Sequence, residues 1–67
     1  MENQGKHLAT FLSECAKIDL STALREIVDR NVTVNNEIVD DPNAKLIDEH
    51  GVASFVGYRG SLYAYYP

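Results

Sequence analysis

The chain has 67 residues, of which 45% are hydrophobic, 24% charged and 9% aromatic, and its formal net charge is −4. This length leaves room for one small α+β domain and excludes two. A domain of this size buries only about 60% of the surface that its unfolded chain exposes, so its stability is marginal without reinforcement. Disulfides within the chain are excluded, because Cys15 is its one cysteine. Tight packing or self-association remains as reinforcement, and of the two we expect self-association as a homodimer.

No metal or cofactor is predicted. The soft ligands His7, Cys15 and His50 match no zinc spacing. The first residues are polar and lack a basic run followed by an apolar one, which predicts no signal peptide. No apolar stretch approaches the roughly 20 residues of a membrane span. Together with the lone thiol, these features predict a cytoplasmic protein that does not bind a membrane.

The negative charge is concentrated in one central segment. Residues 37–49 hold five acids against one base, Lys45, and so carry the whole net charge of −4. We call this the acidic segment, and we expect it to steer the chain towards a basic partner surface. Nucleic acid is disfavoured as a partner, because its binding needs a basic surface that the sequence lacks. The acids of the segment are Glu37, Asp40, Asp41, Asp48 and Glu49.

Two helices are predicted in the first half of the chain. The first covers residues 4–17, where Leu8, Phe11, Leu12 and Cys15 form one apolar stripe at helical spacing. The second begins after an N-cap at Asp19, with Ser21 as the alternative cap, and ends at Asn31 in the left-handed conformation. Its apolar stripe contains Leu20, Ala23, Leu24, Ile27 and Val28.

A hairpin is predicted next, from Val32 to Val39, with Asn35-Asn36 as its two-residue turn. Asparagine tolerates the positive φ that such a turn requires. Residues 42–49 are interpreted as a short helix, because Asp41 can cap it, Pro42 suits its first position and Gly51 suits its end. The alternative extends a strand through residues 45–48, since Leu46-Ile47 fits either period.

A second hairpin is predicted over residues 52–66, with Arg59-Gly60 as its turn. In this register Tyr58 lies opposite Ser61, and Val56 lies opposite Tyr63. One face carries the tyrosines, Val52, Ser54, Val56, Tyr58, Tyr63 and Tyr65, and the other carries Ala53, Phe55, Gly57, Leu62, Ala64 and Tyr66. We expect the second face to be the core face, because it is the more apolar. The elements together predict two N-terminal helices packed on a small antiparallel sheet of two hairpins, with a short helix between the hairpins.

No residue pattern is typical of an enzyme. No nucleophile signature surrounds a serine, and Cys15 lies within an apolar stripe, as a buried core residue would. The acidic pairs Asp40-Asp41 and Asp48-Glu49 lack the spacing of a calcium loop and fit a turn and a solvated helix end. His50, next to Gly51, fits the end of a helix. We therefore predict no catalytic residues.

The tyrosines are the feature that stands above background. All four lie in the last ten residues, next to Arg59. Tyrosine and arginine are enriched at the energetic centres of protein interfaces. We predict a partner-binding surface made by Tyr58, Arg59, Tyr63 and Tyr65. Packing within the fold and stacking on nucleic-acid bases are the alternatives, and the second needs a basic groove as well.

Three functions follow from these patterns. The first is a small non-enzymatic regulator or inhibitor, of the kind common in phages and prophages, that binds a partner protein through the Tyr/Arg-rich hairpin. The second is a nucleic-acid-binding transcriptional regulator of minimal winged-helix type. The segment 19–31, its recognition helix, is not net basic, which disfavours that reading. The third is an enzyme whose site forms at a dimer interface from the acidic pairs, His50 or Cys15.

Overall fold

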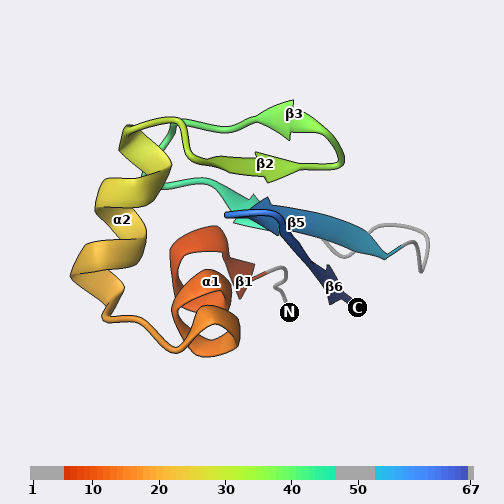
Figure 1. The fold of residues 1–67 in the computed structure, drawn as a ribbon, viewed down its shortest axis with the longest axis horizontal. Helices are drawn as coiled ribbons and strands as arrows, with labels where there is room; N and C mark the ends of the chain where they lie inside the picture. Colours follow the sequence, from red (N-terminus) through yellow and green to blue (C-terminus); the bar gives the residue numbers. More distant parts are fainter. Residues whose placement is uncertain (1–5, 47–52, 67) are drawn as a thin grey trace, which may run out of the picture.

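The structure is a computed structural model that describes residues 6–46 and 53–66. After one two-residue strand come two helices, α1 (Leu8–Ala16) and α2 (Leu20–Val28), and the other strands follow, so the chain has the predicted α+β fold (Figure 1). The strands are β1 (Lys6–His7), β2 (Val32–Val34), β3 (Glu37–Ile38), β4 (Lys45–Leu46), β5 (Ser54–Tyr58) and β6 (Ser61–Tyr65). Neither helix has the length and apolar content needed to cross a membrane, within the described ranges.

Helix α1 begins at Leu8, later than the predicted residue 4. Lys6 and His7 form β1 instead, which pairs antiparallel with β4. The backbone N–H of Leu8 donates to the carbonyl of Ala44 at 2.9 Å. Because the first N–H groups of a helix have no partner within it, this strand-like contact satisfies one of them and sets where the helix begins. The helix ends at Lys17, which has φ 58°.

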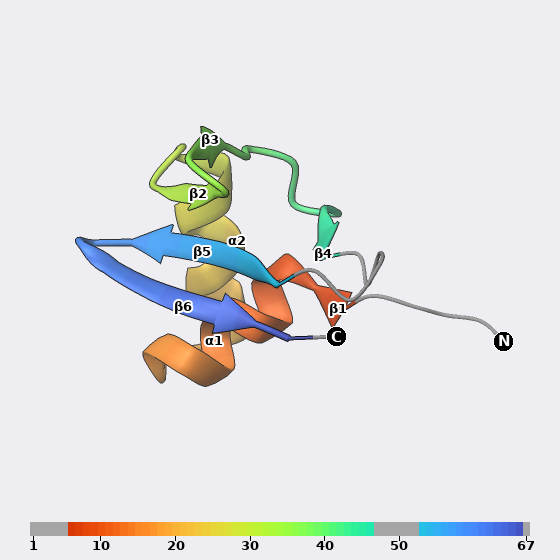
Figure 2. The ribbon, with the colours of Figure 1, turned by 90° about the vertical axis from the view of Figure 1, so that its right-hand side faces the viewer.

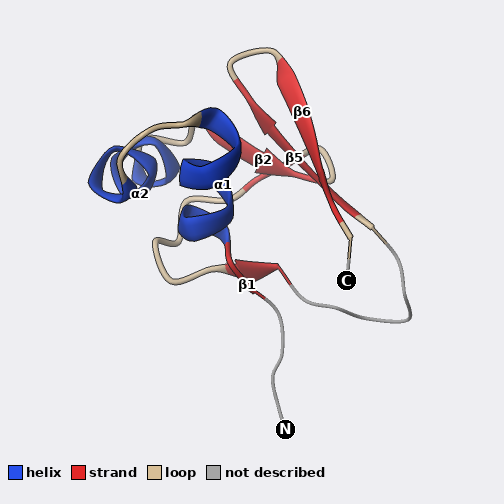
Figure 3. Cartoon of the chain, turned by 90° about the horizontal axis from the view of Figure 1, so that it is seen from below, coloured by secondary structure: helices blue, strands red, loops and turns tan. Residues whose placement is uncertain are grey.

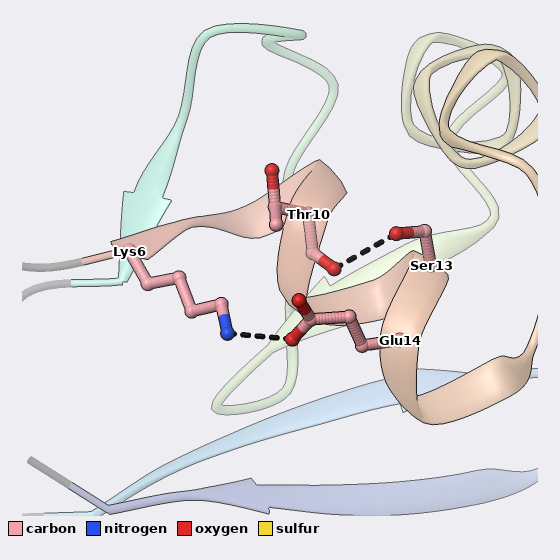
Figure 4. Close-up of polar contacts among 4 residues, drawn as sticks. All are labelled: Lys6, Thr10, Ser13 and Glu14. Carbon is pink, nitrogen blue, oxygen red and sulfur yellow. Dashed lines mark hydrogen bonds and ion pairs between the residues drawn. The ribbon is translucent and has the colours of Figure 1, made fainter.

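An ion pair connects β1 to the exposed side of α1 (Figure 4). The ammonium of Lys6 donates to Oε1 of Glu14 at 2.6 Å. This hydrogen bond, assisted by the negative charge of Glu14, raises the pKa of Lys6 above its usual value of 10.5. One turn away, the hydroxyl of Ser13 donates to the carbonyl of Thr10 at 2.9 Å.

Helix α2 buries Ala23 and Ile27, while Leu20 and Val28 at its two ends stay exposed. Asp19 occupies the predicted N-cap position, but its side chain makes no capping hydrogen bond. The left-handed residue after the helix is Arg30, with φ 66°, and not Asn31 as predicted. The Asn31 side chain instead donates to Glu26 at 2.8 Å, a bond that the sequence pattern did not indicate.

Both predicted hairpins are present, and they join in one four-stranded antiparallel sheet of order β3-β2-β5-β6. The first turn places Asn35 at φ 52° and Asn36 at φ 71°, and the second places Arg59 at φ 51° and Gly60 at φ 80°. These positive values are those of two-residue primed turns. The predicted register of the second hairpin is confirmed at every described pair, from Tyr58 opposite Ser61 to Ser54 opposite Tyr65.

The predicted helix over residues 42–49 is wrong for its described part. Asn43 N–H donates to the Asp41 carboxylate at 2.9 Å, and Ala44 N–H donates to the Asp41 carbonyl at 3.0 Å. Residues 41–44 therefore form a turn with Pro42 and Asn43 at its centre, since an aspartate can close a turn on the backbone that follows it as readily as it caps a helix. Lys45–Leu46 is strand β4, which agrees with the alternative prediction of a strand through residues 45–48. Residues 47–49 lie outside the described part.

Both helices lie on one side of the four-stranded sheet (Figure 3). The core fills the space between the two layers, and α1 supplies its largest share, with Leu8, Ala9, Phe11 and Leu12. The remaining buried apolar residues are Ala23, Ile27, Val32, Leu46, Val56 and Tyr58. The opposite side of the sheet has no helix over it in the described part of the chain (Figures 2 and 3).

The expectation that the face of Phe55 and Leu62 forms the core is wrong. Val56 and Tyr58 are buried, while Phe55 and Leu62 are exposed. The reason lies in the neighbouring strand, because β2 sets Val32 beside Tyr58 and Val34 beside Val56. These β-branched residues extend the tyrosine face into the wider apolar surface, and the helices cover the face that offers more area.

Candidate functional site

The residues predicted to bind a partner are divided by the structure. Tyr58 lies in the core, and Tyr63 and Tyr65 are half-buried and pack against it. The ring of Tyr65 meets that of Phe11 edge-on, with centroids 5.4 Å apart and planes at 81°. Arg59 is exposed at the tip of the hairpin, and its guanidinium lies 5.7 Å from the centre of the Tyr58 ring. Packing within the fold thus accounts for most of the tyrosine surface.

The opposite face of the sheet carries an unusual number of exposed apolar side chains. Ile38, Phe55 and Leu62 are 61%, 46% and 69% exposed, and Tyr66, which follows β6 in the same alternation, is 72% exposed. Four of the six large exposed apolar residues in the described part of the chain therefore share one face, which we call the open sheet face. Its members are Ile38, Phe55, Leu62 and Tyr66. Sequence reasoning named none of them as site residues.

Strand pairing places these side chains in rows. Ile38 lies opposite Thr33, Thr33 opposite Gly57, and Gly57 opposite Leu62. A Cβ atom on Gly57 would lie 2.5 Å from Oγ1 of Thr33, so this position has no room for a larger residue. Because Gly57 has no side chain, the surface is depressed in the middle of this row, between the side chains of Ile38 and Leu62 at its two ends.

Hollows follow this low row towards both ends of the sheet. One, of ≈ 360 Å³, is lined by Asn35, Asn36, Phe55 and Leu62. A second, of similar volume, runs from Thr33 over Gly57 to Arg59 at the hairpin tip. The first hollow has mainly apolar walls with polar groups at its margin, which is typical of a surface that receives a side chain from another molecule, whereas the second is lined largely by polar residues.

A side-chain amide holds one wall of the first hollow in place. The backbone N–H of Asn35 donates to the carbonyl of Phe55 at 2.8 Å, and the N–H of Phe55 donates to Oδ1 of Asn35 at 2.9 Å. The Asn35 side chain thus takes the position of a backbone carbonyl at the point where β2 turns away. Phe55 is thereby fixed at both of its backbone polar groups.

The acidic segment borders this region only in part. Glu37, Asp40 and Asp41 are exposed, and Arg30 donates to the carboxylate of Asp40 at 3.3 Å. In the ranges that the structure describes, Glu37 and Asp41 have no basic side chain within ion-pair distance. Asp48 and Glu49 lie outside the described residues, so the structure does not place the full segment.

The residues weighed for catalysis do not come together in the described part of the chain. Cys15 is half-buried against the core, and His7 is exposed on β1. His50 lies outside the described residues. Over residues 6–46 and 53–66, no three His, Cys, Asp or Glu side chains are close enough to share a metal ion.

No protein-family model matches the chain, and no curated protein matches it significantly.

Proposed function

We propose that the chain is a small non-enzymatic interaction module, a regulator or inhibitor acting in the cytoplasm, that binds a partner protein through its C-terminal hairpin. The observation that supports this most strongly is the open sheet face. Arg59 remains part of the proposed binding surface, and Phe55 and Leu62 provide most of the contact area. The buried tyrosines then have a supporting role, because they hold the hairpin against the helices.

The open sheet face would supply part of the free energy of an interface. Complete burial of a large apolar side chain contributes about 1.5–3 kcal/mol, so covering four half-exposed ones provides on the order of 1 kcal/mol each. The backbone beneath them is set by the Asn35–Phe55 hydrogen bonds. A surface that is rigid before binding loses little conformational entropy when a partner covers it.

The charges indicate the chemistry of the partner. The chain carries a net charge of −4, and the exposed Glu37 lies next to Ile38 on the β3 edge, where strand alternation turns the two side chains to opposite faces of the sheet. A partner with an apolar patch flanked by lysine or arginine would meet both features. Opposite charge of this kind raises the association rate and selects among partners more than it adds affinity.

The test combines capture with a pair of matched variants. The tagged full chain and a Phe55→Ser/Leu62→Ser variant are each incubated with nuclease-treated lysate of the source organism, and the retained proteins are identified by mass spectrometry. The interaction is then measured with the purified partner by calorimetry. We expect the double variant to weaken binding about 30-fold, because it removes two apolar contacts of on the order of 1 kcal/mol each.

The control variant is Leu20→Ser/Val28→Ser, which removes two exposed apolar side chains of similar exposure from α2. Its affinity should stay within about threefold of that of the unchanged chain. The proposed surface would be contradicted if both variants lost affinity equally, or if neither lost affinity. A parallel capture uses untreated lysate, and a partner that is retained only there would favour the nucleic-acid hypothesis instead.

A further inference from the structure

The two outer edges of the four-stranded sheet differ in a way that bears on assembly. One edge is β3, which has two residues, contains Glu37 and is followed by Asp40, Asp41 and Pro42. Short length, charge and proline are the devices by which natural sheets keep an edge from pairing. The other edge is β6, which has five residues and contains neither a charge nor a proline, although Pro67 follows two residues after it.

The backbone groups that β6 turns outward can be identified from the hydrogen bonds of its neighbours. The Phe55 carbonyl accepts from Asn35, so the polar groups of Phe55 point towards β2. The direction of the N–H and carbonyl groups alternates from residue to residue along an antiparallel strand. Those of Val56 therefore point towards Tyr63, its partner on β6. It follows that Leu62 and Ala64 direct their N–H and carbonyl groups away from the sheet. Among the described residues, these groups have no backbone hydrogen-bond partner.

We propose that β6 pairs antiparallel with β6 of a second copy of this chain, about a two-fold axis at Tyr63. In this register Leu62 of each copy exchanges both backbone hydrogen bonds with Ala64 of the other. Four hydrogen bonds then join two sheets into a single eight-stranded one.

A second copy suits this edge for reasons of charge and closure. The chain is acidic overall, yet residues 61–66 carry no charge, so self-pairing opposes no like charges. The β3 edge is protected, so each copy offers one pairing edge and the assembly closes at two chains. An isologous pair of this kind is the commonest form of oligomer.

The position of α1 is compatible with this arrangement. The contact between Phe11 and Tyr65 places α1 at the carboxyl end of β6. In an antiparallel pair centred on Tyr63, the two α1 helices lie at opposite ends of the new strand pair. Because the axis is perpendicular to the sheet, the two open sheet faces lie on the same side.

Amide hydrogen exchange of the full chain tests the pairing directly. At about 1 mM, where even a weak dimer forms, we expect the Leu62 and Ala64 amides to exchange at least about tenfold more slowly than at about 1 μM. The amides of Tyr63 and Tyr65 point towards β5, and they should be protected at both concentrations. Sedimentation equilibrium should give twice the 7.5 kDa chain mass at the higher concentration.

Two proline variants provide a matched comparison. Ala64→Pro removes an outward N–H on the β6 edge and should abolish the dimer, whereas Ile38→Pro removes an outward N–H on the β3 edge and should preserve it. A chain that stays monomeric at about 1 mM overturns the proposal, as does a dimer whose Leu62 and Ala64 amides exchange freely. If Ala64→Pro does not fold, the exchange data on the unchanged chain decide.

Discussion

At the scale of single residues, Asn35 has the most demanding position in the sheet. It adopts a positive φ in the first turn while its backbone and its side chain both bond to Phe55. Asn36, beside it, has a still larger φ of 71° and no described side-chain hydrogen bond. The two asparagines therefore look equivalent in the sequence but have different roles: both adopt a positive φ, and Asn35 also bonds to the neighbouring strand.

Substitutions at these two positions should have opposite effects. Asn35→Ala loses the side-chain acceptor and strains a positive φ, and we expect the free energy of unfolding to fall by about 1–3 kcal/mol. Asn36→Gly relaxes the turn towards its preferred Asn-Gly form and should raise that free energy by about 0.5 kcal/mol. Urea denaturation followed by circular dichroism measures both.

Asn35→Gly separates the two contributions at the first position. It removes the conformational strain but also the acceptor for the Phe55 N–H, so it should still destabilise the chain. Equal stability of Asn35→Gly and the unchanged chain would mean that the amide contributes nothing to the sheet.

At the scale of elements, the Lys6–Glu14 pair predicts how the attachment of β1 depends on pH. The pKa of Lys6 is raised in the folded chain, so the stabilisation is complete below the unfolded value of 10.5 and is lost as pH rises through the folded value. Lys6→Met should therefore lower stability at pH 8 and make a smaller difference at about pH 12. Both side chains are exposed, so the effect is small and weakens with salt.

The comparison at each pH is between the unchanged chain and Lys6→Met, because the tyrosines also ionise in alkali and affect both proteins alike. Unfolding by urea at the two pH values gives the required difference. If the difference in free energy of unfolding is as large at the higher pH, the lysine acts through packing of its aliphatic stem and not through its charge.

The elements also show where sequence reasoning succeeds and where it fails. Both hairpins and the register of the second were predictable, since a two-residue turn fixes the pairing on either side of it. The start of α1 was not, because the N–H of Leu8 bonds to Ala44, a residue far away in the sequence. The choice of core face failed for the same kind of reason, as β2 decides it by pairing with β5.

The candidate site was predictable only in outline. The sequence indicated the C-terminal hairpin, and Arg59 is exposed there. Tyr58, Tyr63 and Tyr65 were predicted as binding residues because tyrosine is common at interfaces. In the structure these three side chains lie in the core or pack against it. The exposure of Ile38 was beyond reach, because it depends on which side of the sheet the helices occupy.

At the scale of the whole molecule, the one-sided sheet predicts how stability and binding divide between its faces. Val56 is fully buried, so Val56→Ala should lower the free energy of unfolding by about 1–3 kcal/mol, whereas the exposed Leu62→Ala should change it by less than about 0.5 kcal/mol. Thermal and urea unfolding check this. A larger loss in Leu62→Ala would place the core on the other face.

The central position of β5 has a consequence for the order of folding during synthesis. This strand joins β2 to β6, yet it comes after both helices and the first hairpin in the chain. A nascent chain that has reached only Leu46 has the helices and one small hairpin, and it lacks the Val56 and Tyr58 side chains that complete their core. Until the ribosome adds the second hairpin, the apolar stripe of α1 can pack against α2 but lacks the side chains of that hairpin, such as Tyr65, which contacts Phe11. Folding is therefore expected to be a late, cooperative event, and a stalled or shortened product would present that stripe to chaperones and proteases.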